Sequence, residues 1–186
     1  DLVALCEDRI LKILANKDAL FNADGSSNVT ATNRVLGNAA PYSGEFGIST
    51  NPESFAAESY RAYFSDKVRG AIMRLSIDGL TPISDHGMKD WFRDNLKLSS
   101  NITGSYDDKK SEYNVTLHKG SYESGTSVTF KEDAKGWVSF KSFVPENAIS
   151  CANEYYTFKN GKLWRHHNEI EGNANTFYGI YTNSSV

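Results

Sequence analysis

A hairpin pattern occurs four times in this sequence, each time as an apolar or aromatic run, a short charged turn and a second strand-like run. The copies span residues 2–14, 60–75, 102–117 and 155–166, with turns centred on Asp8, Asp66, Asp108 and Asn160. A unit that recurs at this scale is the sequence signature of a repeat architecture. The pattern therefore predicts a chain built from hairpin units, and it constrains the fold more than any single residue does.

The spacing of the turns selects between repeat architectures. Turn centres separated by roughly 40 to 60 residues, with several strands per unit, favour propeller blades over helical repeats. We therefore predict a mainly β fold in which antiparallel hairpin repeats form part of a β-propeller-like domain. Because the chain begins at Asp1 rather than Met and ends at Val186, we treat residues 1–186 as a single β-rich segment, an incomplete propeller-like domain of a longer chain.

The N-terminal segment from Leu2 to Phe21 fits two secondary structures. Its apolar residues up to Leu14 roughly follow helical spacing, but no good capping residue precedes them. Because the later hairpins carry stronger β signals, we favour strands with a turn at 16–18. Residues 22–49 are rich in Gly, Asn, Ser and Thr, which predicts an ordered but irregular excursion. Asn51-Pro52 then predicts a single helical turn that Asn51 caps.

The remaining chain contains clear hairpin and helix signals. Hairpins are predicted where turn residues separate strand-like runs, at 70–83, 127–143 and 155–166, with tight turns at Asp78-Gly79 and Asn160-Gly161. A short helix is predicted at 86–96, where an apolar stripe contains Met88, Trp91, Phe92 and Leu96. This helix is expected to link two hairpin units and to pack its aromatic face on the sheet edges.

Composition excludes several classes of protein. The 186 residues are 39% apolar, which suffices for one core, and the formal net charge of -3 gives no general attraction for nucleic acid or anionic membranes. No stretch approaches the roughly 18 consecutive apolar residues of a membrane span. Cys6 and Cys151 are too few for a disulfide framework, and each lies in an apolar run. We expect both to be free, buried thiols.

Two segments resemble metal sites. His166-His167 is one candidate, but neighbouring residues on a strand point to opposite faces, so the pair cannot chelate one ion without a bulge or turn. The segment Asp24–Asn28 has oxygen ligands at alternate positions but lacks the distal Glu of a calcium-binding loop. A surface position for the histidines and a turn for 24–28 are the favoured interpretations, and we predict no cofactor and no metal.

The sequence signals for a catalytic or a sugar-binding site are also weak. Asp107-Asp108 and Glu7-Asp8 are paired acidic residues, but at hairpin tips such side chains satisfy local backbone donors. No nucleophile elbow, phosphate loop or dinucleotide fingerprint is present. Trp91, Trp137 and Trp164 could form a stacking platform for sugars, although such residues more often belong to a core or an interface. We predict no enzymatic activity and assign no catalytic residue.

Three later motifs carry a resemblance to a known class of protein. They are Gly136-Trp-Val-Ser-Phe-Lys-Ser-Phe-Val-Pro-Glu146, Asn153–Asn168 with its central Phe-Lys-Asn-Gly-Lys-Leu, and Asn175-Thr-Phe-Tyr-Gly179. In this order they resemble large tail-associated virion structural proteins of tailed bacteriophages. Tyr63–Leu75, Asp78-Gly79-Leu80 and Gly87–Phe92 are similar to the preceding part of the same proteins, so the resemblance covers most of residues 60–179.

The resemblance implies a noncatalytic structural component of the virion, in a propeller-like part of the tail, nozzle or neck. It implies assembly of several copies into a symmetric ring, contacts with other tail or portal proteins and no membrane span, and it leaves transient contact with ejected DNA open. Two rival hypotheses are a carbohydrate- or receptor-binding module that uses Trp91, Trp137 or Trp164, and a hydrolase with two carboxylates across a cleft.

Overall fold

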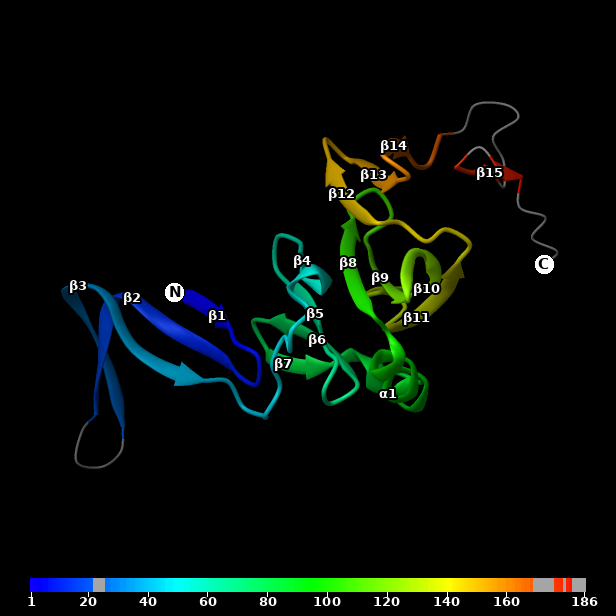
Figure 1. Ribbon diagram of the computed structural model, residues 1–186. Helices are drawn as coiled ribbons and strands as arrows, with labels where there is room; N and C mark the ends of the chain where they lie inside the picture. Colours follow the sequence, from blue (N-terminus) through cyan, green and yellow to red (C-terminus); the bar gives the residue numbers. More distant parts are fainter. Residues whose placement is uncertain (22–25, 169–175, 179, 182–186) are drawn as a thin grey trace.

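The protein is described here from a computed structural model, which covers residues 1–21, 26–168, 176–178 and 180–181. The chain is mainly β, as predicted, and its strands form separate antiparallel sheets (Figure 1). These sheets do not close into a barrel or a propeller within the residues covered. No helix in the same residues is long and apolar enough to span a membrane.

The N-terminal sheet is a long ribbon that projects from the rest of the molecule (Figure 1). Its strands are β1 (Leu2–Leu5), β2 (Ile10–Phe21) and β3 (Ser27–Pro41), in the order β1-β2-β3. We call this sheet A. The strand interpretation of residues 2–14 is therefore confirmed, and the helical alternative is wrong.

Two predictions within sheet A are wrong. The expected turn at 16–18 is absent, because β2 continues through an irregularity in which Asn16 adopts a positive φ of 55°. The expected irregular excursion contains the 15-residue strand β3, which pairs with β2. Gly37 permits this close approach, since a Cβ there would lie 1.9 Å from the Lys17 carbonyl oxygen. Small polar residues fit a ribbon whose faces are both solvated, so their composition resembles that of a loop.

Sheet B follows the ribbon and contains the hairpin predicted at 70–83. Its strands are β4 (Ala56–Ala57), β5 (Ala62–Asp66), β6 (Ala71–Ser76) and β7 (Gly79–Pro82), in sequence order. The 3-10 helix η1 (Pro52–Ser54) precedes it at the predicted helical turn, with Pro52 in the first position. The Asn51 side chain makes no capping hydrogen bond, so that part of the prediction is wrong.

The predicted helix links sheet B to the next sheet. The 3-10 helix η2 (Ile83–Asp85) leads into α1 (Lys89–Leu98), close to the expected 86–96. Phe92 and Leu96 are fully buried, and Met88 and Trp91 pack against the same cluster. Burying a side chain such as Phe92 contributes about 1.5–3 kcal/mol, so the predicted stripe is what holds this helix.

Two further sheets and a short hairpin complete the described chain. Sheet C has the order β11-β10-β9-β8, from β8 (Asn101–Asp107), β9 (Glu112–Lys119), β10 (Ser121–Lys131) and β11 (Gly136–Lys141). Sheet D has the order β12-β13-β14, from β12 (Asn147–Cys151), β13 (Glu154–Lys159) and β14 (Lys162–Arg165). The pair β15 (Thr176–Phe177) and β16 (Ile180–Tyr181) follows.

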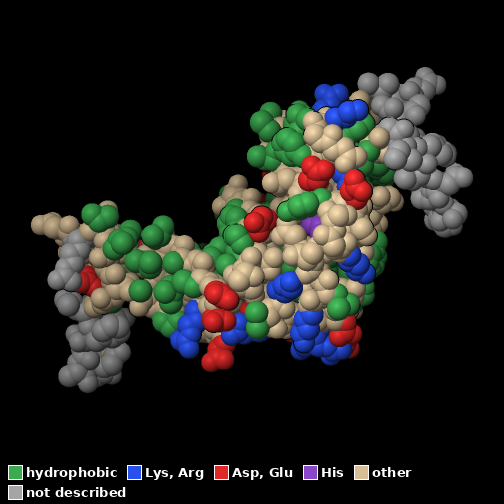
Figure 2. All heavy atoms as spheres, viewed as in Figure 1, with side chains coloured by type: hydrophobic (Ala, Val, Ile, Leu, Met, Phe, Trp, Pro, Cys, Tyr) green, Lys and Arg blue, Asp and Glu red, His purple; other side chains and the backbone are tan. Residues whose placement is uncertain are grey.

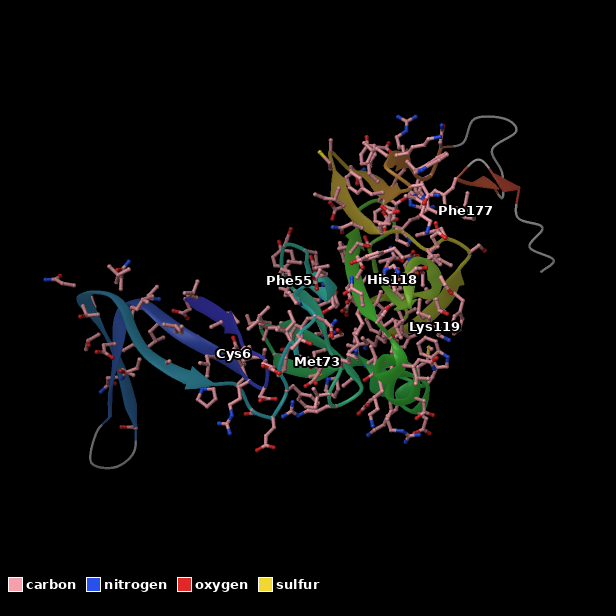
Figure 3. All side chains as sticks on the ribbon, in the orientation of Figure 1. Cys6, Phe55, Met73, His118, Lys119 and Phe177 are labelled. Atoms are coloured by element: carbon pink, nitrogen blue, oxygen red, sulfur yellow. The ribbon has the colours of Figure 1, made fainter. Side chains whose placement is uncertain are left out.

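Two cores lie on opposite faces of sheet B. Tyr63 and Ile72 belong to a cluster shared with α1 and sheet C, whereas their neighbours Phe64 and Met73 belong to a cluster shared with Ile10 at the base of the ribbon. Because successive residues of a strand alternate between faces, β5 and β6 serve both cores. Figure 3 shows Met73 near the junction of the ribbon and the body.

Two of the four predicted hairpin copies share one turn geometry, and so does the β10–β11 hairpin outside the predicted repeat. Hairpins β5–β6, β8–β9 and β10–β11 each have a four-residue loop, since Asp66 pairs with Ala71, Asp107 with Glu112 and Lys131 with Gly136. The fourth loop residue has a positive φ in every case: Gly70, Ser111 and Lys135. The hairpin at Asn160-Gly161 instead has a two-residue turn with φ of 54° and 68°. This combination of positive φ values confirms the predicted tight turn.

The two cysteines differ from expectation. Both are free, as predicted, but both are exposed rather than buried. Cys6 lies in the loop after β1 (Figure 3), and Cys151 ends β12 beside the β12–β13 turn. An apolar run in the sequence does not bury a residue at the end of a strand, because no second layer covers it there.

Candidate functional site

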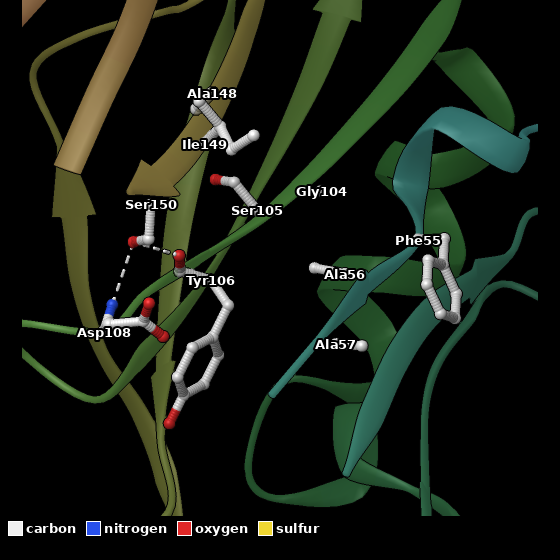
Figure 4. A pocket seen from close by; sticks show the side chains of 10 residues that line it. All are labelled: Phe55, Ala56, Ala57, Gly104, Ser105, Tyr106, Asp108, Ala148, Ile149 and Ser150. Atoms are coloured by element: carbon white, nitrogen blue, oxygen red, sulfur yellow. Dashed lines mark hydrogen bonds between the residues drawn. The ribbon is translucent and has the colours of Figure 1, made fainter. Parts of the chain in front are cut away.

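The site that the fold builds is a groove between three sheets (Figure 4). It encloses about 270 Å³ and is lined by β4 with the preceding Phe55, by β8 with the following Asp108, and by β12. Each of these strands is the first of its sheet in the chain and lies at that sheet's edge. The groove thus brings together residues that are nearly a hundred positions apart in the sequence.

Small side chains shape the side of the groove between sheets B and C. Gly104 of β8 lies against the backbone of η1, and a Cβ at this position would lie 1.9 Å from the Ser54 carbonyl oxygen. That same carbonyl accepts a hydrogen bond of 2.9 Å from the Tyr113 hydroxyl. Glycine is therefore required at Gly104, because any larger residue would separate the two sheets.

Serine hydroxyls fix the side of the groove between sheets C and D. Ser150 of β12 donates to the Tyr106 carbonyl oxygen at 2.8 Å and accepts from the Asp108 amide at 3.0 Å (Figure 4). Ser105 and Tyr155 join their hydroxyls at 2.8 Å. These bonds satisfy backbone groups at the edge of β8 and hold β12 beside it without a continuous ladder.

A partly buried carboxylate network ties the end of sheet C to sheet B. Glu132, in the β10–β11 loop, accepts from the Tyr63 hydroxyl at 2.8 Å and pairs with the Arg74 guanidinium at 2.8 Å. Burial, followed by the hydrogen bond to Glu132, raises the pKa of Tyr63 far above its ordinary value, so this hydroxyl remains a donor. Trp137 adds a bond from its indole nitrogen to the Ile83 carbonyl oxygen at 3.0 Å.

A second buried carboxylate ties the base of the ribbon to sheet B. Asp66 is fully buried and accepts from the Gly47 amide at 3.0 Å, the Ser49 hydroxyl at 3.1 Å and the Arg69 amide at 3.0 Å. The Arg69 guanidinium lies 3.1 Å from the same carboxylate and 3.7 Å from Asp8. Asp66, predicted only as the centre of a repeat turn, is thus a structural centre for sheets A and B.

Asp107 occupies the equivalent position in the β8–β9 hairpin. Its Oδ1 accepts from the amides of Lys109 and Lys110, as predicted for a hairpin tip. Its Oδ2 lies 2.5 Å from Nε2 of His167, which follows β14. The predicted local role is confirmed, and the structure adds a contact that ties sheet D to sheet C. Asp108 lines the groove, where it is the one Asp or Glu among the ten lining residues.

The histidine pair is split between two environments, so the predicted surface position is wrong for His166. His166 is buried and bonds to the Thr157 hydroxyl at 2.7 Å, whereas His167 turns to Asp107 with a positive φ of 56°. Burial, and secondarily the neighbouring His167, lower the pKa of His166 to about 4. No group of three His, Cys, Asp or Glu side chains that could hold a metal occurs among the described residues. The other metal candidate, Asp24–Asn28, lies partly outside those residues.

The tryptophans serve packing, Trp91 and Trp137 in one cluster and Trp164 elsewhere. Trp137 lies against Phe92, with ring centroids 4.4 Å apart, and Trp91 lies between Phe92 and Phe140. Trp164 instead contacts Tyr178 beside sheet D. All three indoles are half-buried, and they do not form one stacking platform.

Sequence reasoning missed the roles of Asp66 and Glu132. One signal was available for Asp66, since an acidic residue ends the first strand of both the β5–β6 and β8–β9 hairpins, directly before a four-residue loop. Glu132 gave no local signal, because its partners lie 58 and 69 positions away. The arrangement offers rigid positioning of sheet edges and no pair of carboxylates facing each other across the groove.

A comparison with known protein families identifies the family of this chain. A family model described as Crassvirus muzzle protein matches residues 2–161, which is most of the chain. The chain belongs to the Crassvirus muzzle protein family. The resemblance to phage virion structural proteins is therefore confirmed at this level, and the chain is a virion structural protein. No curated protein matches the chain.

The muzzle-family match covers a different range of residues from the resemblance noted in the sequence. The resemblance noted from the sequence was strongest over residues 60–179, whereas the match begins at residue 2 and includes all of sheets A, B and C. It ends at residue 161, inside the β13–β14 turn, so the motif Asn175–Gly179 lies outside it. The ribbon thus lies within the matched region.

Proposed function

We propose that this chain is a noncatalytic structural component of the phage tail, and that it forms a symmetric ring with further copies and contacts other tail or portal proteins. The single observation that carries the proposal is the arrangement of β4, β8 and β12. The first strands of three consecutive sheets line one groove. Blades of a propeller likewise arrange their sheets around a central channel, so we infer that sheets B, C and D are a propeller-like arc.

The contacts between sheets support a rigid structural role. Glu132 joins sheets B and C, and Asp107 with Ser150 joins sheets C and D, each through side chains that are at most partly exposed. Buried polar contacts of this kind hold neighbouring sheets in one relative position more strictly than apolar packing alone. A rigid arc with loops at its rim suits assembly into a particle.

The groove itself favours scaffolding over catalysis. Its lining consists mostly of Ala, Gly and Ser with two aromatic residues, and Asp108 is its one carboxylate. A conventional glycosidase needs two carboxyl groups about 5 to 10 Å apart. Contact of this surface with DNA during ejection stays a prediction, and the lining contains no Lys or Arg that would favour it.

Immunogold labelling of intact virions tests the proposal. Antibodies raised against the 186-residue chain are expected to label the tail, and antibodies against the major capsid protein serve as the positional control. Labelling confined to the capsid, or no label on particles whose tails are intact and accessible to another tail antibody, would contradict the proposal.

A further inference from the structure

We propose that the ribbon of β2 and β3 in one copy of this chain docks on the outward face of sheet D in a second copy. The inference rests on the proposed assembly into a ring and names the two surfaces that would build it. It begins from two exposed apolar surfaces that lie at opposite ends of the molecule (Figures 1 and 2).

The first surface belongs to the ribbon. Among the described side chains of β2 and β3, Ile10 at the base is the one that is fully buried. Farther along β3, Val29, Val35 and Leu36 are 60%, 73% and 54% exposed. An isolated two-stranded ribbon is only marginally stable in water. Exposed apolar side chains such as Val35 and Leu36 make the isolated ribbon less favourable still, and they are typical of an interaction surface. The ribbon therefore has the properties of an arm that packs against a partner.

The second surface is the outward face of sheet D. Phe158 pairs directly with Leu163, and Ile149 pairs with Tyr156, so these residues share one face. Ile149, Phe158 and Leu163 are 55%, 42% and 59% exposed. The alternate residues Tyr155 and Thr157 are buried toward sheet C. Sheet D thus has one face packed in the molecule and one face on which Phe158 and Leu163 stay exposed beside polar residues such as Asn147 and Arg165, with Ile149 at the edge that also borders the groove.

The positions of the two surfaces point to a contact between copies. The ribbon extends from one end of the chain and sheet D lies at the other, with sheets B and C between them (Figure 1). The ribbon is held at its base through Asp66, which directs it away from the body. An arm and a receiving face that are different surfaces of one chain make a head-to-tail contact, which closes into a ring or continues as a filament.

The size of the ribbon fits a specific contact. Stable interfaces use about 20 to 30 residues on each side. Strands β2 and β3 contain 12 and 15 residues, and most of their described side chains are not buried. The exposed Val29, Val35 and Leu36 of the ribbon would pack on an uncovered sheet face, which accepts a second β layer about 10 Å away.

Complementary variants of the 186-residue chain test this contact. The double substitution V35D/L36D replaces apolar side chains of the ribbon by carboxylates, so the ribbon should no longer dock. The double substitution F158K/L163K places two Lys side chains on the outward face of sheet D, so this face should no longer receive the ribbon. The wild-type chain is expected to self-associate in sedimentation velocity, whereas each variant alone should show at least a tenfold higher dissociation constant. Mixing the two variants should restore a 1:1 dimer that grows no further, because one intact arm meets one intact face. Ile77→Asp, at a 99% exposed turn position outside both surfaces, is the matched control and should associate as wild type.

A cross-link keeps the test independent of the charged substitutions. Cys151 is exposed on the same face as Ile149, two residues along β12. In a Cys6→Ser background, Val35→Cys should form a covalent dimer through a short bis-maleimide, and Ile77→Cys should not. The proposal is overturned if the wild-type chain stays monomeric, if either variant assembles as wild type, if the mixture stays monomeric, or if Val35→Cys gives no dimer. If one of these results is found while antibodies against the chain still label the tail, the proposed structural role stands and only this interface is rejected.

Discussion

The Tyr63 hydroxyl in β5 donates a hydrogen bond of 2.8 Å to Oε1 of Glu132, 69 positions later in the chain. The Tyr63 ring also stacks on Tyr113 of β9, with centroids 4.7 Å apart. One residue thus contributes both the apolar and the polar contact that join sheets B and C. Because the same carboxylate also pairs with Arg74, this junction depends on the charge of Glu132.

Glu132→Gln should lower the free energy of unfolding by about 2 kcal/mol. The amide removes the charge that Arg74 faces and weakens the bond from Tyr63, and hydrogen bonds to charged groups contribute about 1.5–3 kcal/mol. Urea unfolding followed by tryptophan fluorescence measures the change. Glu123→Gln, at an exposed position of β10, is the control and should change stability by less than about 0.5 kcal/mol. Equal effects of the two substitutions would show that the junction does not need the carboxylate.

Asp66→Asn should loosen the base of the ribbon. The new amide nitrogen replaces either Oδ2, which accepts from the Gly47 amide, or Oδ1, which accepts from the Arg69 amide, so at least one buried hydrogen bond is lost, at about 1–3 kcal/mol. Hydrogen exchange of the Gly47 and Ser49 amides should accelerate more than exchange within β9. Asp78→Asn in the exposed β6–β7 turn is the matched control. Unchanged protection of Gly47 in Asp66→Asn would contradict the role assigned to this carboxylate.

His166 should make the protein less stable as the pH falls from about 6.5 to about 4. The buried imidazole has a pKa of about 4, so across this window the unfolded chain binds a proton that the native chain excludes. Stability is lost as the pH falls, by up to about 3 kcal/mol in total, and this contribution is constant below the window. His166→Gln should flatten the dependence, measured by urea unfolding at several pH values. His86→Gln, at an exposed position, should leave it unchanged, and a steep dependence that survives in His166→Gln would refute the assignment.

Gly161→Val should destabilise sheet D by about 1–2 kcal/mol through the backbone alone. Gly161 has a φ of 68°, and a β-branched residue resists this conformation. No atom lies within 4 Å of a Cβ at this position, so steric contact contributes nothing. Gly136→Ala is the control, because its φ is not positive and its added Cβ would have only an ordinary 3.6 Å contact. A melting temperature of Gly161→Val equal to that of the wild type would indicate a different turn.

The sequence predicted those elements that are determined by residues close together in the chain. The stripe of Met88, Phe92 and Leu96 predicted α1, and Asn160-Gly161 predicted its tight turn. The length of β3 was not predicted, because the strand is defined by pairing with β2 and its residues resemble a loop. Prediction of the cysteines also failed, since exposure at the end of a strand depends on whether another layer covers it.

The candidate site was less predictable than the fold. The groove is formed by strands that begin at positions 56, 101 and 147, and nothing local to any of them indicates that they meet. Gly104 is required by the carbonyl of Ser54, a neighbour only in space. Asp66 and Asp107 were visible as turn residues, but the partners that make them structural lie in other sheets. Each of these contacts is long-range, which is why residue patterns alone do not contain them.

The most direct test of the account is a cryo-EM map of the intact virion tail at side-chain resolution. We expect density for sheets B, C and D in several copies around the tail axis, with β4, β8 and β12 lining a common groove and the ribbon of each copy reaching its neighbour. A map that places this chain in the capsid, or as a single copy without rotational symmetry, would contradict the central claim.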